Sequence, residues 1–488
     1  MRQSEPQRIK GWFYLPESSA DRIPGILTWQ PDAGASLELI GGFSPRPDFQ
    51  ATSTGGLRAT GIVGHVRPGT IYGDSDSGQP VTIWDAQRGK YTAGFTGNVH
   101  EEFWHSSWIC VGAHIPSPQD PAFTEAKVSI DELYYLTSDQ RFCPPQWAKI
   151  EGVEHPGETQ PDGTLLTPYI FPVVGGYRAE HAEGSTTDAR YSVATTATRP
   201  WASEATEAMP ELKLQMMTTN LRRGQIVTLH AGAHVSIRLP DNVSGSGADF
   251  AERMAPIEDL IQLATFDACG VEQITLDADN DVEISLLMHA GKVAQPDDVH
   301  GAASVVFTLD DVPLEAFLKT RQRLTTGNQA KYAWNVTVGL CGYTSHIVEE
   351  YVSQTLAAAE GFHCWCLEGG ERVSLNSRLK ALHDQLDPEV QAALGLDTEH
   401  WASWAVWARN HVAHGGTKRW RSPRDNFQLH VIGESVHLIT YLVALQEFGV
   451  PRDKVLDALR NHPRLQVRVQ RSSGVNSLPA EPPPGDPA

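Results

Sequence analysis

The segment RNHVAHGG, Arg409 to Gly416, combines three side chains that could cleave RNA without a metal ion. Arg409 supplies a permanent cation with a planar fork of donors, which suits the non-bridging oxygens of a phosphate. His414 supplies an imidazole, which titrates at about pH 6.5 when unperturbed and can move protons at cellular pH. Asn410 supplies an amide that can orient the imidazole or the phosphate. We expect Arg409, Asn410 and His414 to be the catalytic residues.

The spacing of Arg409 and His414 is by itself a loose pattern. It recurs at Arg378 and His383 in RLKALH, and at a slightly longer spacing in Arg424 and His430. The segment at Arg409 differs from these because Asn410 follows the arginine directly and two glycines close the segment as a helix stop. We therefore prefer Arg409 to the other two arginines.

The residues from Asp397 to His414 are predicted to form a helix, with Asp397 as its N-cap and Glu399 in its first turn. At about 100° per residue, the predicted core face contains Trp401, Trp404, Ala405, Ala408 and Val412. The opposite side contains Ser403, Trp407, Asn410 and His414. The motif is therefore expected to point away from the core of its own helix. The alternative, a histidine satisfied within a hydrophobic interior, stays open.

Three stretches carry a resemblance to known families. RNHVAH resembles the RNxxxH signature of the HEPN superfamily, and YVSQTLAAAEGFHCW resembles the early helix of its Apea-like branch. Glu360 and His363, near the end of that helix, are a candidate secondary site. The run GWFYLPE, then PGILTW, then SLELIGGF, resembles the opening of the N-terminal domain of ApeA-type phage-defence proteins. The resemblance covers residues 8–145 and 340–450.

This resemblance implies a metal-independent endoribonuclease that needs no cofactor and acts by abortive infection in the bacterial cytoplasm. It implies RNA as substrate, with tRNA suggested by related toxins, a phage-derived protein as trigger, and a homodimer or higher homo-oligomer formed through the HEPN domain. The alternative is a catalytically inactive HEPN and β-sandwich module that binds or scaffolds. A carbohydrate-active enzyme ranks last, because no acidic pair stands at a recognisable spacing.

The net charge of −20 opposes binding to a polyanion, but the charge is uneven. The first 300 residues carry 21 basic and 39 acidic side chains, whereas Arg409 to Arg471 carries eleven basic and five acidic ones. Four cations that follow the motif are candidate RNA-binding residues: Lys418, Arg419, Arg421 and Arg424. A solvated loop is the alternative. Trp407 could stack on a base, pack in a dimer interface, or be buried within its own bundle.

The predicted fold class is multidomain α+β, with a β-rich sandwich or barrel followed by an all-α HEPN bundle. The expected boundaries are residues 1–310 for the β-rich sensor region, with a break near 150–210, then 311–465 for the bundle and 466–488 for a disordered tail. The start of the chain lacks an apolar signal region, and no run of eighteen apolar residues predicts a membrane span. The six scattered cysteines are expected to be reduced, and no metal site is expected.

Overall fold

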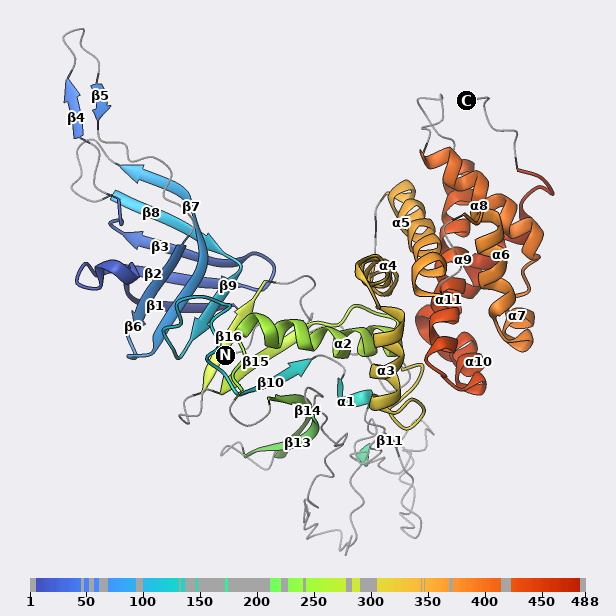
Figure 1. Ribbon diagram of the computed structural model, residues 1–488, viewed down its shortest axis with the longest axis horizontal. Helices are drawn as coiled ribbons and strands as arrows, with labels where there is room; N and C mark the ends of the chain where they lie inside the picture. The colour runs from blue at the N-terminus through green and yellow to red at the C-terminus, as the bar shows by residue number, and fades with distance from the viewer. Residues whose placement is uncertain are drawn as a thin grey trace, which may run out of the picture.

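The computed structural model describes residues 6–44, 48–51, 57–60, 69–93, 100–130, 133–136, 146–147, 172–173, 211–220, 227–239, 243–277, 283–289, 305–343, 345, 347–367, 372–413 and 423–482. Figure 1 shows the strands gathered at one end of the molecule and the helical bundle at the other, with helix α2 (Gly247–Thr265) between them. The β-rich region therefore precedes a helical domain, as the hydrophobic patterning predicted.

Six antiparallel strands of the N-terminal region close into a barrel. Strand β7 (Pro80–Ala93) closes it, because it pairs with β6 along its first half and with β8 along its second half. The other five strands are β1 (Gln7–Tyr14), β2 (Ile23–Gln30), β3 (Gly34–Ile40), β6 (Gly69–Ser75) and β8 (His100–Ser106). Alternation explains the barrel interior: Leu37 and Leu39 are buried, whereas Glu38 between them is exposed. Strands β2 and β3 pair as an antiparallel hairpin.

The same sheet continues beyond β7 as an open layer. Its strands are β9 (Trp108–Val111), β16 (Ile284–Met288), β15 (Val271–Asp277), β10 (Glu125–Ile130), β14 (Val227–Arg238) and β13 (Glu211–Asn220), in that order. Strand β10 lies between β14 and β15, so the chain on both sides of residues 150–210 builds one hydrogen-bonded layer. The described part of that segment is strand β12 (Pro172–Val173), which pairs with β11 (Gln146–Trp147). A short hairpin of β4 (Asp48–Ala51) and β5 (Leu57–Thr60) and the four-residue helix α1 (Leu133–Leu136) complete the region.

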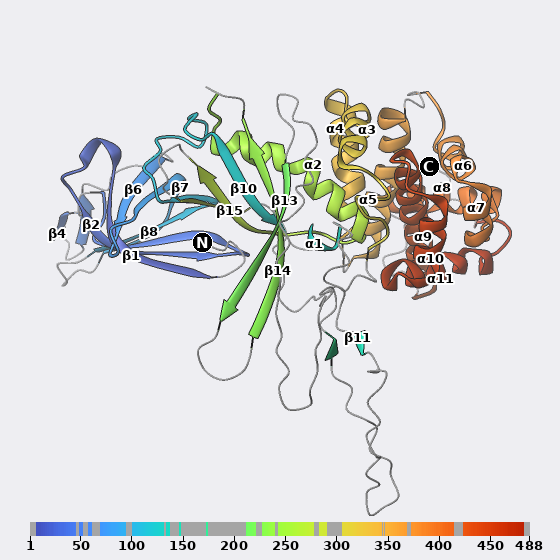
Figure 2. The same cartoon turned by 90° about the horizontal axis from the view of Figure 1, so that it is seen from below.

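Helix α2 links the open layer to the bundle. Ser246 caps it by accepting a hydrogen bond from the Asp249 backbone, while the Asp249 carboxylate accepts one from the Ser246 backbone. Figure 2 shows α2 running from the strands toward the helices. The buried residues of α2 belong to one hydrophobic cluster that extends from Val128 and Ile274 of the sheet to the bundle. The open layer and the bundle therefore share a continuous core, whereas the barrel interior forms a separate cluster that includes Phe13, Leu37 and Ile83.

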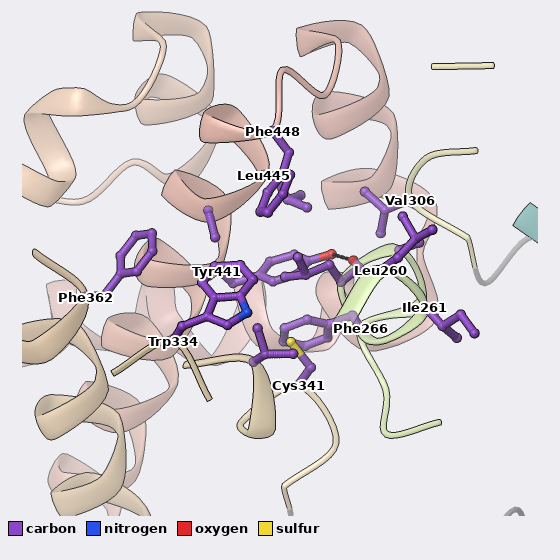
Figure 3. Packing of buried hydrophobic residues seen from close by; sticks show 14 of the residues in the cluster. Leu260, Ile261, Phe266, Val306, Trp334, Cys341, Phe362, Tyr441, Leu445 and Phe448 are labelled. Atoms are coloured by element: carbon purple, nitrogen blue, oxygen red, sulfur yellow. Dashed lines mark hydrogen bonds between the residues drawn. The ribbon is translucent and has the colours of Figure 1, made fainter. Parts of the chain in front are cut away.

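The junction at the end of α2 combines the apolar packing that Figure 3 shows with a few buried polar bonds. Phe266 packs against Tyr441, with ring centroids 4.4 Å apart, and the Tyr441 hydroxyl donates to the Leu263 carbonyl at 2.6 Å. The carboxylate of Asp259 accepts from the Trp334 indole at 2.7 Å and pairs with Arg321 at 2.5 Å. Because buried polar atoms are costly when left unpaired, these bonds fix one orientation of α2 against the bundle.

The C-terminal region is a helical bundle. Its members are α3 (Leu314–Leu324), α4 (Asn328–Gly339), α5 (Val348–Gly361), a π-helical turn η4 (Phe362–Cys366), α6 (Leu375–Gln385), α7 (Pro388–Leu394), α8 (Thr398–Ala413), α9 (Pro423–Glu447), α10 (Arg452–Asn461) and α11 (Pro463–Ser472). Helix α9 contacts α5, α6, α8 and α11 and is buried on nearly all sides from Leu429 to Leu445. A helix that is apolar all round is expected at such a centre.

The C-terminal tail differs from the expected disorder over residues 466–488. Helix α11 continues to Ser472, and a 3-10 turn, η5 (Ser473–Ser477), follows it. Leu465 and Val475 are fully buried, and Leu478 is nearly so. These three apolar residues are spread over a polar, proline-containing stretch, so the sequence shows little hydrophobic periodicity there. Their burial is favourable because they pack against the rest of the bundle.

Candidate active site

Helix α8 confirms the predicted helix and its core face. The Asp397 carboxylate accepts from the backbone amide of His400 at 2.9 Å, and the Asp397 carbonyl accepts from Trp401. Trp401, Trp404, Ala405 and Ala408 are fully buried, whereas Val412 is only partly buried. The core face therefore holds the helix in place and leaves its last described turn at the surface.

Arg409 and Asn410 are both exposed on that last turn. Within the described part of the chain, no ion pair joins the Arg409 guanidinium to a carboxylate. His414 lies outside the described residues, as do Lys418, Arg419 and Arg421. Arg424 lies in the first turn of α9, and its side chain also lies outside the description. The structure thus places two of the three expected catalytic residues together on an accessible helix end.

The competing arginine and histidine pair at the same spacing is in a different environment. Arg378 and His383, on α6, are 3% and 4% exposed. His383 Nδ1 lies 2.9 Å from the Thr398 hydroxyl, and its ring packs against Trp401. Arg378 donates from Nε to the Val373 carbonyl. Burial separates this pair from substrate, so exposure distinguishes Arg409 from it where spacing could not.

Trp407 is partly buried and packs within its own bundle. Its ring stacks on His411, with centroids 4.7 Å apart and an interplanar angle of 21°. Its other contact is edge-to-face with Trp404 at 5.1 Å. A base could stack on the face that His411 covers only if His411 moved away. His411 follows Asn410 directly, and the sequence analysis did not single it out.

Glu360 and His363 lie at the end of α5 and in the π-helical turn that follows it. Glu360 is half-buried, whereas His363 is 9% exposed and its Nδ1 has no hydrogen-bond partner among the described residues. Burial, and secondarily the nearby Arg378 cation, lowers the pKa of His363 below that of a free imidazole. Across the described residues, neither side chain bonds to Arg409 or Asn410. A neutral imidazole packed inside the bundle is what these contacts support.

A charged network that the sequence analysis missed lies between α5, α9 and α11. The carboxylate of Glu434 is buried and pairs with Arg468 at 2.5 Å and with Arg471 at 3.3 Å. Arg468 also donates to the Tyr351 hydroxyl, which lies 3.2 Å from His437 Nδ1. Burial lowers the pKa of His437 and raises that of Tyr351, so both side chains are neutral near pH 7. The sequence does carry one indication of this network, because Glu434 stands within an otherwise mostly apolar run of α9.

Most of the described cations beyond α9 are already paired. Arg452 pairs with Glu389 at 2.9 Å, Lys454 with Asp311 at 3.3 Å, and Arg464 with Asp267. The described cations that follow α9 are therefore used largely in ion pairs within the molecule. A phosphate-binding rim, if built as expected, depends on the four cations between residues 418 and 424.

The described residues contain no cluster of three or more histidine, cysteine or acidic side chains able to hold a metal ion. Five of the six cysteines are described, and each is a free thiol. One described helix is long and apolar enough to cross a membrane, residues 426–447 of α9, and 94% of its apolar window is buried inside the bundle. A buried core helix passes that test equally well, so this feature is weak support for a membrane span.

Comparison with known families assigns the helical bundle first. Residues 314–454 match the Apea-like HEPN family, whose wider HEPN class generally comprises ribonucleases that commonly dimerise and act on RNA. Residues 8–144 match ApeA N-terminal domain 1. The chain therefore has the architecture of the ApeA-type phage-defence proteins, as the sequence resemblance indicated. No curated protein and no solved structure matches the chain.

Proposed function

We propose that this protein is a metal-independent endoribonuclease that halts growth of phage-infected bacteria. The observation that carries the proposal is the exposure of Arg409 and Asn410 on the last turn of α8, within a bundle of the HEPN class. The order Arg-Asn followed by His414 is the one expected of an RNxxxH nuclease. The β-rich N-terminal region would sense a phage-derived protein in the bacterial cytoplasm and restrain the bundle until infection.

The proposed reaction is a transesterification within the RNA chain. The ribose 2′-hydroxyl attacks the adjacent phosphorus as His414 accepts its proton, and the bond from phosphorus to the 5′-oxygen of the next nucleotide breaks. That oxygen takes a proton from an acid, so the products are a 2′,3′-cyclic phosphate and a 5′-hydroxyl. Arg409 stabilises the charge that accumulates on the non-bridging oxygens, and Asn410 orients His414 or the phosphate. DNA lacks the attacking hydroxyl and is spared.

A second subunit would supply the acid that one imidazole cannot supply alone. The proposal is that two bundles pair so that their motif ends face one another, with two-fold symmetry as the commonest arrangement. Phe427 supports such a contact, because it lies near the start of α9 and is 54% exposed. Replacing Phe427 by serine is expected to shift a dimer toward monomer in light scattering, and an unchanged mass would remove Phe427 from the interface.

The substrate proposal is cellular RNA, with tRNA as the candidate that related toxins suggest. Purified protein is incubated with total cellular RNA in the presence of a chelator, alongside Arg409→Ala and His414→Ala. The matched control is Arg460→Ala, because Arg460 is also exposed but lies on α10. We expect cleavage by the wild type and the control, a loss of at least about 100-fold in both motif variants, and ends bearing a cyclic phosphate.

Each outcome of this experiment bears on the proposal. Equal cleavage by the wild type and both motif variants would remove the motif from the mechanism. Loss of cleavage on adding chelator would show that a divalent ion takes part. Absence of cleavage, together with absence of growth arrest on induced expression, would favour the binding or scaffold role.

A further inference from the structure

Three aromatic rings run along α8 toward the motif. The indole of Trp404 packs edge-to-face against Trp407, at 5.1 Å and 72°, and Trp407 stacks on His411 at 4.7 Å and 21°. We call these three residues the ring ladder. Its last member is the residue after Asn410, so the ladder ends on the same turn as both exposed site residues.

The other end of the ladder is tied to the C-terminal residues Ser473–Glu481, which we call the strap. Trp404 Nε1 donates to the Pro479 carbonyl at 3.0 Å. The two ring nitrogens of His400 lie 3.2 Å and 3.3 Å from the carbonyl oxygens of Val475 and Ala480. Asn476 donates to the Gly395 carbonyl at 3.0 Å. The strap therefore binds α8 through three of its backbone carbonyls and binds Gly395, which precedes α8, through the Asn476 side chain.

The strap is held firmly enough to act as an anchor. Val475 is fully buried and Leu478 is 9% exposed, so both side chains pack into the bundle. Beyond the core residue Ala408, in contrast, α8 is exposed at Arg409, Asn410 and Ala413. The last turn of a helix frays readily, because its carbonyls lack partners within the helix. In the described chain the ladder is the aromatic contact that reaches this turn.

We propose that Trp404, Trp407 and His411 are positioning residues, through which the strap holds Arg409 and Asn410 in place. The consequence for catalysis rests on the proposed ribonuclease function. The consequence for the order of the helix end does not. Loosening the ladder would let the last turn of α8 unfold locally more often. It would then displace the Arg409 guanidinium from the position in which it binds the phosphate. Misplacement of about 1 Å at a reacting group can cost about 100-fold in rate.

Trp404→Phe tests the anchor in the full-length protein, since it keeps a buried ring but removes the indole N–H that binds Pro479. The matched control is Trp401→Phe. Trp401 is also fully buried on α8, and its indole donates at 2.8 Å to the Ser435 hydroxyl on α9 instead of to the strap. The first readout is hydrogen exchange of the backbone amides from Arg409 to Ala413. We expect exchange about tenfold faster in Trp404→Phe than in Trp401→Phe.

His411 is tested by two substitutions. His411→Ala removes the stack on Trp407, whereas His411→Phe keeps an aromatic ring there without an imidazole. We expect fast exchange and a kcat about tenfold lower, with KM little changed, for His411→Ala and Trp404→Phe. His411→Phe should remain close to the wild type in both measurements.

The two readouts separate the possible failures. Equal exchange in Trp404→Phe and Trp401→Phe would overturn the ladder, whether or not the protein cleaves RNA. Equal loss of kcat in His411→Phe and His411→Ala would show that the imidazole itself is needed, which also overturns a positioning role. If the wild type shows no cleavage that depends on Arg409, the ribonuclease proposal fails, and the exchange data still decide whether the strap orders the helix end.

Discussion

At the scale of single residues, exposure separates the candidate catalytic Arg409 from Arg378, which has a histidine at the same spacing. Arg378, like Arg409, has a histidine five residues later in the sequence, but it lies on α6 and is only 3% exposed. Arg409 is exposed on a helix end whose inner face is fixed by fully buried tryptophans. A side chain in that position can change with little effect on folding, so activity and stability can be measured apart.

Arg409→Lys is a sharper test of the arginine than alanine, because it keeps the charge and removes the planar fork. We expect cleavage to fall by about tenfold or more, since a lysine cannot bind two phosphate oxygens in the same geometry. The free energy of unfolding should change by less than about 0.5 kcal/mol, because the side chain is exposed. Steady-state kinetics and urea unfolding check both statements. Wild-type kinetics in Arg409→Lys would mean that charge alone is sufficient.

At the scale of elements, two glycines near the end of α4 meet very different surroundings. A Cβ at Gly342 would lie 2.2 Å from the backbone nitrogen of Ala268 in the loop that follows α2. A Cβ at Gly339, the last residue of α4, would meet no atom within 4 Å. The backbone at Gly342 therefore packs so closely against the loop after α2 that only glycine, which has no Cβ, fits there without a shift of backbone.

The two substitutions to alanine are expected to act in opposite directions. Gly342→Ala should lower the free energy of unfolding by about 1–3 kcal/mol, because backbone must shift to admit the methyl group. Gly339→Ala should raise it by about 0.4–1 kcal/mol, because alanine reduces the entropy of the unfolded chain and fits the helix. Chemical denaturation measures both. Equal effects of the two changes would contradict the packing described at the junction.

At the scale of the whole molecule, the open layer and the bundle are joined by a shared hydrophobic core. They are also joined by ion pairs in which the acidic side chain always comes from the earlier part of the chain. Among the described residues, four ion pairs lie at the junction, and in each the acid lies between residues 252 and 311 and the base lies beyond residue 311. They are Arg321 with Asp259, Lys331 with Glu252, Lys454 with Asp311, and Arg464 with Asp267. Residues 252–311 thus supply the acidic side of an interface inside the molecule.

A fragment beginning at residue 311 tests whether the bundle folds alone. We expect it to aggregate, because removal of α2 and Phe266 would expose apolar surface around Trp334 and Tyr441 and leave Arg321 without its carboxylate. Solubility and thermal unfolding of the fragment beside the full chain check this. A soluble fragment with a cooperative transition would mean that the two parts are independent folding units.

The pH dependence of thermal stability should report the protonation of Glu258 on α2. Burial, and then the nearby Asp259, raises the pKa of Glu258 to about 7. A carboxyl with a raised pKa in the folded state stabilises the fold while protonated, so its contribution is present at low pH and is lost as pH rises through 7. We expect the wild type to lose thermal stability between about pH 5 and pH 8. Glu258→Gln should flatten that slope, and an unchanged slope would assign it to other groups.

The sequence by itself determined the local features of this protein. Alternation at Leu37, Glu38 and Leu39 gave a strand, the cap at Asp397 began a helix, and the spacing of tryptophans chose its buried face. These features depend on residues that are close together in the sequence, so they can be read from the sequence alone. The same holds for the order of Arg409 and Asn410, which can be read directly from the sequence.

Tertiary structure alone decided the contacts between distant segments. It brought β10 between β14 and β15, joined the β-rich region to the bundle through α2, and turned the C-terminal residues into a strap on α8. It also buried Arg378 and His383 while leaving Arg409 exposed. Burial of a side chain depends on surfaces contributed by remote parts of the chain, and no local pattern encodes those surfaces.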